Sequence, residues 1–305
     1  MNKKNKNKLF LLLLLVLFVT VGCTKQLKNS DNKSVTNPTT GQALTENILC
    51  KPKDEETIAI YEENGVDLSK LPECSNFSVT SGGYEGIWTS VFVKPLAWAI
   101  ISIGKLVRSH GLALIITSLV IRLIAYPITK KTAIQSELMA KAKPDLDKLE
   151  KKYANKTDND SMMKKSQEMA LIYKKYNINP VSGCLYAFIQ LPLFIAFLEA
   201  INRVPAIFEE NFLGFQLGTT PWVGLFGGNL IYVILTIIVA LSTYYSLKFN
   251  SASNPDNAQV KSMNKFMFFM ILIMSLFMSS ALNIYWITTN LFTVAQNLIV
   301  KRKKV

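Results

Sequence analysis

The stretch that decides the fold is Gly111–Thr129, which reads GLALIITSLVIRLIAYPIT. As an α-helix with a rise of about 1.5 Å per residue, it covers about 30 Å, the thickness of the hydrocarbon layer of a membrane. Its single charge, Arg122, lies well inside the apolar run. An arginine there costs about 2.5–3.5 kcal/mol on insertion scales, so it requires water, a partner or a polar cavity. The stretch therefore predicts a transmembrane helix over 110–129 that carries a functional charge.

Four further apolar segments of similar length follow, at 180–202, 229–247, 266–282 and 284–300. Only Asn283 separates the last two, which predicts a tight hairpin around this residue. Together with 110–129, these segments predict an all-α integral membrane protein with five transmembrane helices.

The start of the chain is typical of a targeting segment. Lysines between Lys3 and Lys8 precede an apolar core over 9–19 that is too short to span a membrane. The core ends at Thr20-Val21-Gly22-Cys23, which is similar to the lipobox of bacterial lipoproteins. We expect 1–22 to be a signal peptide and Cys23 to be diacylated. The alternative is an ordinary signal peptide, or an uncleaved anchor, with an incidental cysteine.

The polar segment 23–85 is rich in Asn, Ser, Thr, Lys and Glu. It predicts an extracytoplasmic tether that is flexible to about Gly41. A short helical element is expected within 45–74. Cys50 and Cys74 lie on the same outer side, so they form either a small disulfide-closed element or two free thiols.

The segment 86–109 is apolar, but Lys94, Lys105 and Arg108 lie near one helical face. This pattern predicts an amphipathic helix that lies on the outer surface of the membrane. A spanning helix is the alternative. Two tryptophans suit the headgroup boundary, namely Trp88 and Trp98.

Charge in the loops predicts the orientation. The loop 130–179 holds 12 lysines against 7 acidic residues, whereas 203–228 holds one arginine against two acids. The positive-inside rule places 130–179, the 248–265 loop and the basic 301–305 tail in the cytoplasm. The N-terminus then lies outside a bacterial cytoplasmic membrane, which agrees with a lipid anchor there.

The cytoplasmic loop has a structure of its own. Apolar residues recur at helical spacing over Ala133–Tyr153 and Met162–Tyr176, and Asn155 to Asp160 between them are turn and capping residues. The pattern predicts an antiparallel helical hairpin. Its lysines suit anionic lipid headgroups or ribosomal RNA.

The sequence lacks the patterns of an enzyme. It has no Walker phosphate loop, no protease signature and no metal-ligand spacing. His110, the sole histidine, is expected at the outer end of the first span, and Cys184 is expected to be a packing residue. The net charge of +13 comes without a nucleic-acid recognition motif. We therefore expect no catalytic residue, no cofactor, no metal and no DNA partner.

The surroundings of Arg122 are expected to be polar. Glu199 is the acid available within the spans, but Arg203 lies one helical turn away and is its expected partner. Arg122 then faces an aqueous cavity, unless its side chain reaches the inner headgroups. Polar side chains on the spans could line this cavity: Thr117, Ser118, Gln190, Thr236, Ser242, Thr243, Ser246, Thr288, Thr289, Asn290 and Gln296. The long amides Gln190 and Gln296 could instead bridge two helices.

Several motifs within 86–300 occur in an order that resembles the YidC/Oxa/Alb family of membrane protein insertases. They are Ile121-Arg122-Leu123-Ile124 with Pro127, Tyr173–Tyr176, Asn179–Cys184 with Ile189–Phe194, and Tyr285-Trp286 with Asn290 and Gln296. The lipoprotein start and the five-span layout resemble the Gram-positive branch. Three features depart from the family pattern: Tyr186 replaces a proline, Ser280–Asn283 replaces Pro-Ala-Gly-Leu, and a glutamine near Ser246 is missing.

The resemblance implies an insertase that moves nascent membrane proteins into the membrane through a polar groove containing Arg122, alone or with the Sec translocon. It adds Trp286 to the expected groove residues. The implied partners are nascent membrane proteins, the Sec translocon, the ribosome and anionic lipids, and no cofactor is implied. Two other functions stay open: a solute transporter or channel, and a non-catalytic assembly factor.

Overall fold

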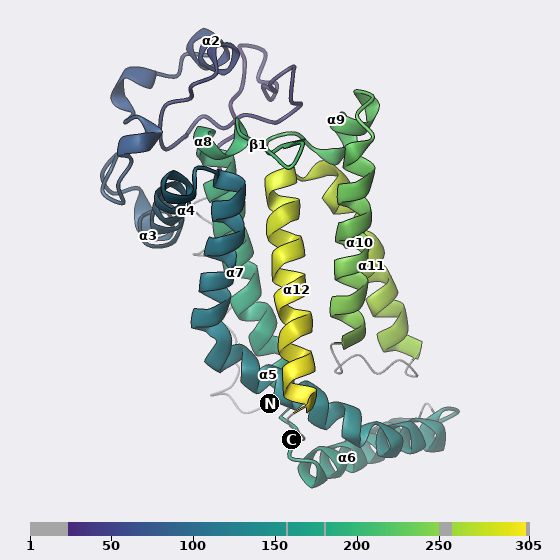
Figure 1. The fold of residues 1–305 in the computed structure, drawn as a ribbon. Coiled ribbons are helices and arrows are strands. Elements are labelled where there is room, and N and C mark those ends of the chain that lie inside the picture. Colours follow the sequence, from purple (N-terminus) through teal and green to yellow (C-terminus); the bar gives the residue numbers. More distant parts are fainter. Residues whose placement is uncertain (1–23, 157, 180, 250–257, 303–305) are drawn as a thin grey trace. The chain divides into compact units, whose positions relative to one another are not determined.

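The computed structural model describes residues 24–156, 158–179, 181–249 and 258–302; side chains are described for all of these except 181–189, 258–261 and 263. The expected signal peptide, Cys23 and the end of the basic tail lie outside these ranges. The side chain of Cys184 does too. The described chain is mostly helical and divides into two compact units, which several long helices share (Figure 1).

The first unit contains residues up to 117, 191–233 and 277–284. Its N-terminal part, 24–85, has α2 (Glu55–Glu63) and the short 3₁₀ turns η2 (Leu68–Lys70) and η3 (Cys74–Asn76). Isolated bridges such as Gln26–Thr45 and Thr36–Ala43 pair the chain before α2. A small core holds these pieces together, made of Leu27, Leu44, Ile48, Tyr61 and Leu68. The expectation of a flexible tether up to Gly41 is therefore wrong, because this stretch buries apolar side chains and pairs its backbone.

A continuous helical run follows, built from α3 (Gly86–Trp88), the π-helical turn η4 (Thr89–Val93) and α4 (Lys94–Val107). It ends at Arg108, whose backbone is left-handed. Lys94 is fully buried in this run, whereas Lys105 is exposed. The expectation that Lys94 shares an exposed polar face is therefore wrong.

The expected outer loop is folded rather than irregular. It contains α8 (Pro205–Phe208), a hairpin of β1 (Asn211–Phe212) with β2 (Phe215–Gln216), and α9 (Pro221–Phe226). The antiparallel strands pair Asn211 with Gln216 and Phe212 with Phe215. Leu213 and Gly214 both have positive φ at the tip, as a tight hairpin turn demands.

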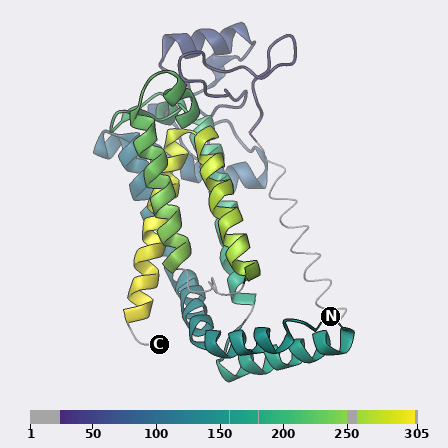
Figure 2. The ribbon, with the colours of Figure 1, turned by 90° about the vertical axis from the view of Figure 1, so that its right-hand side faces the viewer.

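The second unit contains 118–190, 234–276 and 285–305. It holds most of α5 (His110–Tyr153), α6 (Asn159–Lys175), the start of α7 (Val181–Arg203), most of α10 (Ile231–Phe249) and α11 (Ala258–Phe277), and most of α12 (Ser280–Arg302). Contrary to expectation, the first span and the first hairpin helix are one helix of 44 residues, with Pro127 and Pro144 inside it. Figure 2 shows that α5 changes direction before it meets α6.

The hairpin of α5 and α6 is held by ion pairs. Lys152 contacts Glu168 at 2.6 Å, and Lys175 contacts Asp145 at 2.6 Å. Asp158 caps α6 by accepting from the Ser161 amide at 2.8 Å, as the turn composition indicates. The α5–α6 hairpin therefore forms where the sequence places it.

The connection between α11 and α12 differs from the expected hairpin around Asn283. The chain turns at 278–279, and Asn283 lies in the first turn of α12. Its side-chain amide donates to the carbonyls of Met278 and Ser279 at 3.2 and 3.3 Å. Asn283 therefore ties the helix start to the turn, and the turn itself comes earlier because Ser280 and Ala281 already belong to the helix.

Three described helices are long and apolar enough to cross a membrane by length and composition: Gly86–Val107, His110–Tyr153 and Ile231–Phe249. A shorter apolar helix covers Asn264–Phe277. Helices α7 and α12 cover the remaining two predicted spans. These helices make the chain an all-α integral membrane protein, while the count of five spans and the surface position of 86–109 stay predictions.

Candidate functional site

The charge in the first span is buried and hydrogen-bonded. Arg122 lies on α5 with 4% of its surface exposed. Its Nη2 donates to Oε1 of Gln190 on α7 at 2.5 Å. The sequence predicts both residues in one cavity but does not predict their pairing. Because an amide oxygen accepts a hydrogen bond without carrying a charge, Gln190 orients the guanidinium and leaves its positive charge in place.

A second polar contact joins α10 and α12. The side-chain amide of Asn290 donates to Thr243 Oγ1 at 3.0 Å and to Ser242 Oγ at 3.3 Å. Thr243 is buried, whereas Asn290 and Ser246 are half-buried. Helix α10 lacks the glutamine that the family pattern has near Ser246. It still makes a polar contact with α12, about one helical turn before Ser246.

Gln296 forms a third contact, between α12 and α5. Its amide exchanges hydrogen bonds with the Thr129 hydroxyl at 3.1 and 3.2 Å, and the residue is 7% exposed. Gln296 therefore bridges two helices, which is the alternative that its position in the sequence leaves open. Thr129 was missed because a threonine at the end of a predicted span gives no distinctive signal.

The remaining expected groove residues are divided between the units. Thr117 belongs to the first unit and Ser118 to the second, and both are buried on α5. Thr289 is buried on α12, where its hydroxyl donates to the Trp286 carbonyl at 3.0 Å, and Trp286 is half-buried. The second unit thus brings together most of the expected set on α5, α7, α10 and α12.

A small cavity of about 170 Å³ lies at the far end of the same unit, beyond Thr129 along α5. Its lining mixes charged, polar and apolar side chains: Ala133, Ser136, Glu137, Lys248, Phe249, Asn297, Val300 and Lys301. The sequence does not predict this cavity, because its lining comes from three separate helices. The cavity is too small for a polypeptide and is wide enough only for a few waters or one small group.

The first unit contains a separate cluster of charges, of which Lys94, Glu199 and Arg203 are buried. Glu199 and Arg203 on α7 lie 3.8 Å apart, as expected. Arg203 has a shorter contact with Glu85, at 2.7 Å, and Glu85 also pairs with Lys94 at 2.8 Å. Burial raises the pKa of Glu85, but the hydrogen bonds from Lys94 and Arg203 outweigh it and hold the pKa below its usual value. Glu85 and Arg203 are 118 residues apart in the sequence, so no local sequence pattern could predict this cluster.

Trp88 is part of this cluster. Its indole N–H donates to Glu199 Oε1 at 2.8 Å, and 5% of the residue is exposed. Trp88 therefore packs inside the protein, and its place at the headgroup boundary stays a prediction. Trp98, with 46% of its surface exposed, remains suited to that position.

His110 also has a structural partner. Its Nδ1 lies 2.5 Å from Glu210, which further accepts hydrogen bonds from the His110 amide and the Ser109 hydroxyl. Burial raises the pKa of Glu210, but the His110 amide and its neighbours together bring it below the usual value. Glu210 therefore caps the start of α5 from the folded outer loop. Among the described residues, no group of three or more His, Cys, Asp or Glu could hold a metal ion.

Comparison with known proteins adds the family. The model of the 60Kd inner membrane protein family matches residues 102–305. Membrane protein insertase YidC of Oceanobacillus iheyensis is 34% identical over 226 residues, covering 72% of this chain and 85% of the relative. Membrane protein insertase MisCA of Bacillus subtilis is 33% identical over 216 residues, covering 70% and 79%.

One solved structure, described as an active YidC insertase with the first transmembrane domain resolved, is 21% identical with a TM-score of 0.48. The similarity covers 79% of this chain and 50% of that one, so this chain spans about half its length. The family model and the curated relatives show that the chain belongs to the 60Kd inner membrane protein family, the family of the YidC insertases.

Proposed function

We propose that this chain inserts nascent membrane proteins into the bacterial cytoplasmic membrane, with Arg122 as the cationic centre of a polar groove. The observation that carries the proposal is Arg122 itself, buried on a helix apolar enough to span a membrane and oriented by Gln190. The names of the relatives support membrane insertion as the function, because both relatives are membrane protein insertases and not catalytic enzymes.

The charge of Arg122 suits the passage of a polar tail. Arginine stays protonated at any physiological pH, so its charge is permanent. A polar, water-accessible wall lowers the free-energy barrier that the polar tail of a substrate meets when it crosses the membrane. The guanidinium attracts acidic residues in that tail. Gln190 holds the guanidinium in one orientation, which reduces the cost of ordering it when a substrate arrives.

The other proposed groove residues differ in how much of their surface is exposed. Gln190, Ser246, Trp286 and Asn290 are half-buried, and they are the members with surface left to contact a substrate. The others are buried: Thr117, Ser118, Thr243, Thr289 and Gln296. The Gln296–Thr129 bond fixes α12 on α5, and the Asn290–Thr243 bond fixes α12 on α10.

Insertion along such a groove needs no nucleotide. Transfer of an apolar substrate helix into lipid is favourable by itself. The membrane potential adds about 2.3 kcal/mol per charge per 100 mV for an acidic tail that moves outward. The protein has only to lower the barrier, which agrees with the absence of a phosphate-binding loop from the sequence.

The proposed topology has five spans, an N-terminus outside that is anchored by lipid on Cys23, and a C-terminus in the cytoplasm. The helical run 86–109 lies on the outer surface. The α5–α6 hairpin stands in the cytoplasm, where its lysines meet anionic lipids and the ribosome, and nascent membrane proteins arrive alone or through the Sec translocon. The lysine excess of 130–179 supports this arrangement.

Complementation of an insertase-depleted bacterium tests the function. We expect the wild-type chain and Lys141→Ala to restore growth, since Lys141 is an exposed cation on the same helix. Arg122→Ala should fail for substrates with acidic tails, and Arg122→Lys should restore part of the yield because it keeps the charge. A membrane-localised wild-type chain that restores no insertion would contradict the insertase function. Solute flux in liposomes without insertion would indicate a transporter or channel instead.

A further inference from the structure

Residues 24–85 lie outside the part of the chain that the family model matches, and they fold around their own small core. Their contacts reach the end of α7, the loop 203–228 and α4. Three of them reach the last residues of α7: the Leu49 amide donates to the Arg203 carbonyl at 2.8 Å, the Thr45 hydroxyl to the Asn202 carbonyl at 3.1 Å, and Arg203 Nε to the Asn47 carbonyl at 2.6 Å. Segment 45–49 thus satisfies carbonyls that a helix end leaves without partners.

Arg203 is the centre of this contact. It is 1% exposed, and its Nη2 lies 2.7 Å from Glu85. Glu85 in turn holds Lys94, whose ammonium also donates to the carbonyls of Ser81 and Gly83 at 2.7 Å each. Two buried cations therefore join α7 and α4 to the segment 81–85. Removal of Lys94 would take this donor from the Ser81 and Gly83 carbonyls, and removal of Arg203 would take the cation from the buried Glu199.

Three further contacts extend the interface over the folded outer loop. Glu209 accepts from the Lys53 and Asp54 amides, at 3.0 and 3.3 Å for the closest pairs. A Cβ on Gly41, whose φ is +68°, would come within 2.5 Å of Val223 Cγ2. A Cβ on Gly218 would come within 2.3 Å of Gln42 Oε1. Glycine permits both close approaches, so the two surfaces are fitted to each other along the loop.

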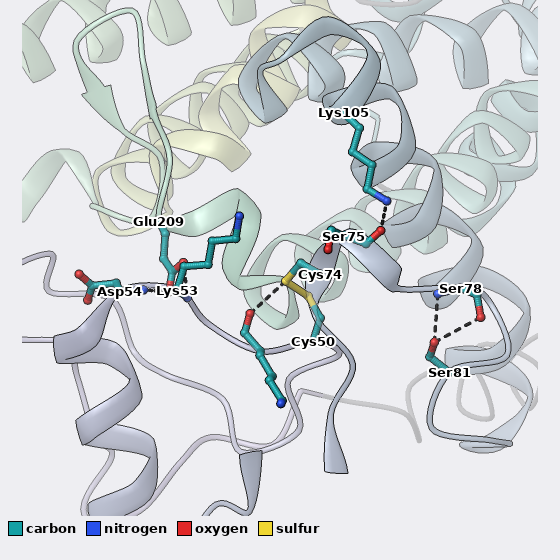
Figure 3. Close-up of a disulfide and its surroundings, with 10 residues drawn as sticks. Cys50, Lys53, Asp54, Cys74, Ser75, Ser78, Ser81, Lys105 and Glu209 are labelled. Carbon is teal, nitrogen blue, oxygen red and sulfur yellow. Dashed lines mark hydrogen bonds between the residues drawn. A yellow bond between two sulfur atoms is a disulfide. The ribbon is translucent and has the colours of Figure 1, made fainter. Parts of the chain in front are cut away.

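The disulfide between Cys50 and Cys74 joins the two edges of this interface (Figure 3). Cys50 directly follows the segment that contacts Arg203, and it is fully buried. Cys74 precedes Ser75, whose carbonyl accepts from Lys105 on α4. Next to the bond, the Lys51 amide donates to the Pro72 carbonyl at 2.9 Å. The disulfide thus connects the edge that contacts α7 to the edge that contacts α4.

We propose that residues 24–85 are an intramolecular cap on the 203–228 loop, latched to α7 by Arg203 and locked by the Cys50–Cys74 disulfide. The cap covers Glu209, Gly218 and Val223 of the loop. Loss of either the latch or the lock opens the cap and exposes the loop. This inference concerns residues beyond the family match and is independent of the insertion assay.

Limited digestion of the purified full chain in nanodiscs with thermolysin tests the cap. We expect cleavage within 203–228 to become at least about 10-fold faster in Arg203→Gln, since 1.4 kcal/mol corresponds to a factor of ten. The double variant Cys50→Ser/Cys74→Ser should show the same cleavage sites at a raised rate. Thr45→Val removes one hydrogen bond and should have a smaller effect at the same sites. Lys70→Gln, an exposed cation of the cap, is the matched control and should digest like wild type.

Two results would overturn the cap. One is an unchanged rate of loop cleavage in the double serine variant and in Thr45→Val, even if Arg203→Gln is faster, because Arg203 would then act only within its own helix. The other is faster cleavage inside 24–85 with no change in 203–228. Cleavage sites within α10 report whether a variant has unfolded as a whole, and the two variants located in the cap decide the outcome if Arg203→Gln has done so.

Discussion

Lys94 provides the sharpest test of the buried charge cluster. Its side chain is fully buried, and its ammonium has three acceptors: the Ser81 and Gly83 carbonyls at 2.7 Å and Glu85 at 2.8 Å. Lys94→Met keeps an unbranched apolar side chain that is one atom shorter, and it removes the charge. Breaking a buried pair from one side costs about 3–5 kcal/mol. Glu85 is 34% exposed on its side chain and keeps Arg203, so we expect the lower end, about 3 kcal/mol.

Hydrogen exchange measures this loss directly. A local stability lower by about 3 kcal/mol corresponds to exchange that is faster by a factor on the order of 100. We expect this change at the amides of 81–90, including that of Glu85, which donates to Ser90 Oγ at 3.1 Å. Lys70→Met is the control, because Lys70 is an exposed cation of the same unit that lies outside the cluster. Equal and small changes in the two variants would refute the conclusion that the buried pair stabilises this region.

Three further results are expected. Replacing Cys50 and Cys74 by serine should lower the stability of 24–85 by about 2–4 kcal/mol, measured by denaturant-dependent hydrogen exchange, and a loss below about 0.5 kcal/mol would contradict it. The pKa of Glu210 is lowered in the folded state, so its contribution to stability is present above its unfolded pKa and is lost as pH falls through the folded value. Acid should therefore loosen its contact with His110, and Glu210→Gln should remove this pH dependence in exchange of the first α5 amides. Asp158→Ala should cost about 1 kcal/mol at the start of α6, with no effect on amides of α10.

Features that depend on residues close together in the sequence could be predicted from the sequence alone. The apolar run around Arg122 predicts a helix, and a helix is found there. The capping residues before α6 predict its start, and Asp158 caps it. The Glu199–Arg203 pair follows from a spacing of four residues on one helix.

Features that depend on distant residues were not predictable in the same way. Segment 24–44 has few apolar residues, yet Leu27 and Leu44 bury fully once they meet Tyr61. The sequence predicts Lys94 on an exposed polar face. Its partner Glu85 lies before the helix, in a segment that the sequence predicts to be a tether, so the burial of Lys94 could not be predicted. The polar contacts of Arg122 and Asn290 each join two helices, and no spacing in the sequence could assign Gln190 to one and Thr243 to the other.

The insertion yield of a matched pair of substrates in proteoliposomes tests the role of Arg122 most directly. The two substrates share one apolar helix and differ only in whether the translocated tail carries acidic or neutral residues. We predict that Arg122→Ala lowers the yield of the acidic substrate severalfold relative to the neutral one, and that Arg122→Lys restores part of the difference. A ratio of yields that is the same for Arg122→Ala and wild type, at equal amounts of reconstituted protein, would contradict the cationic groove.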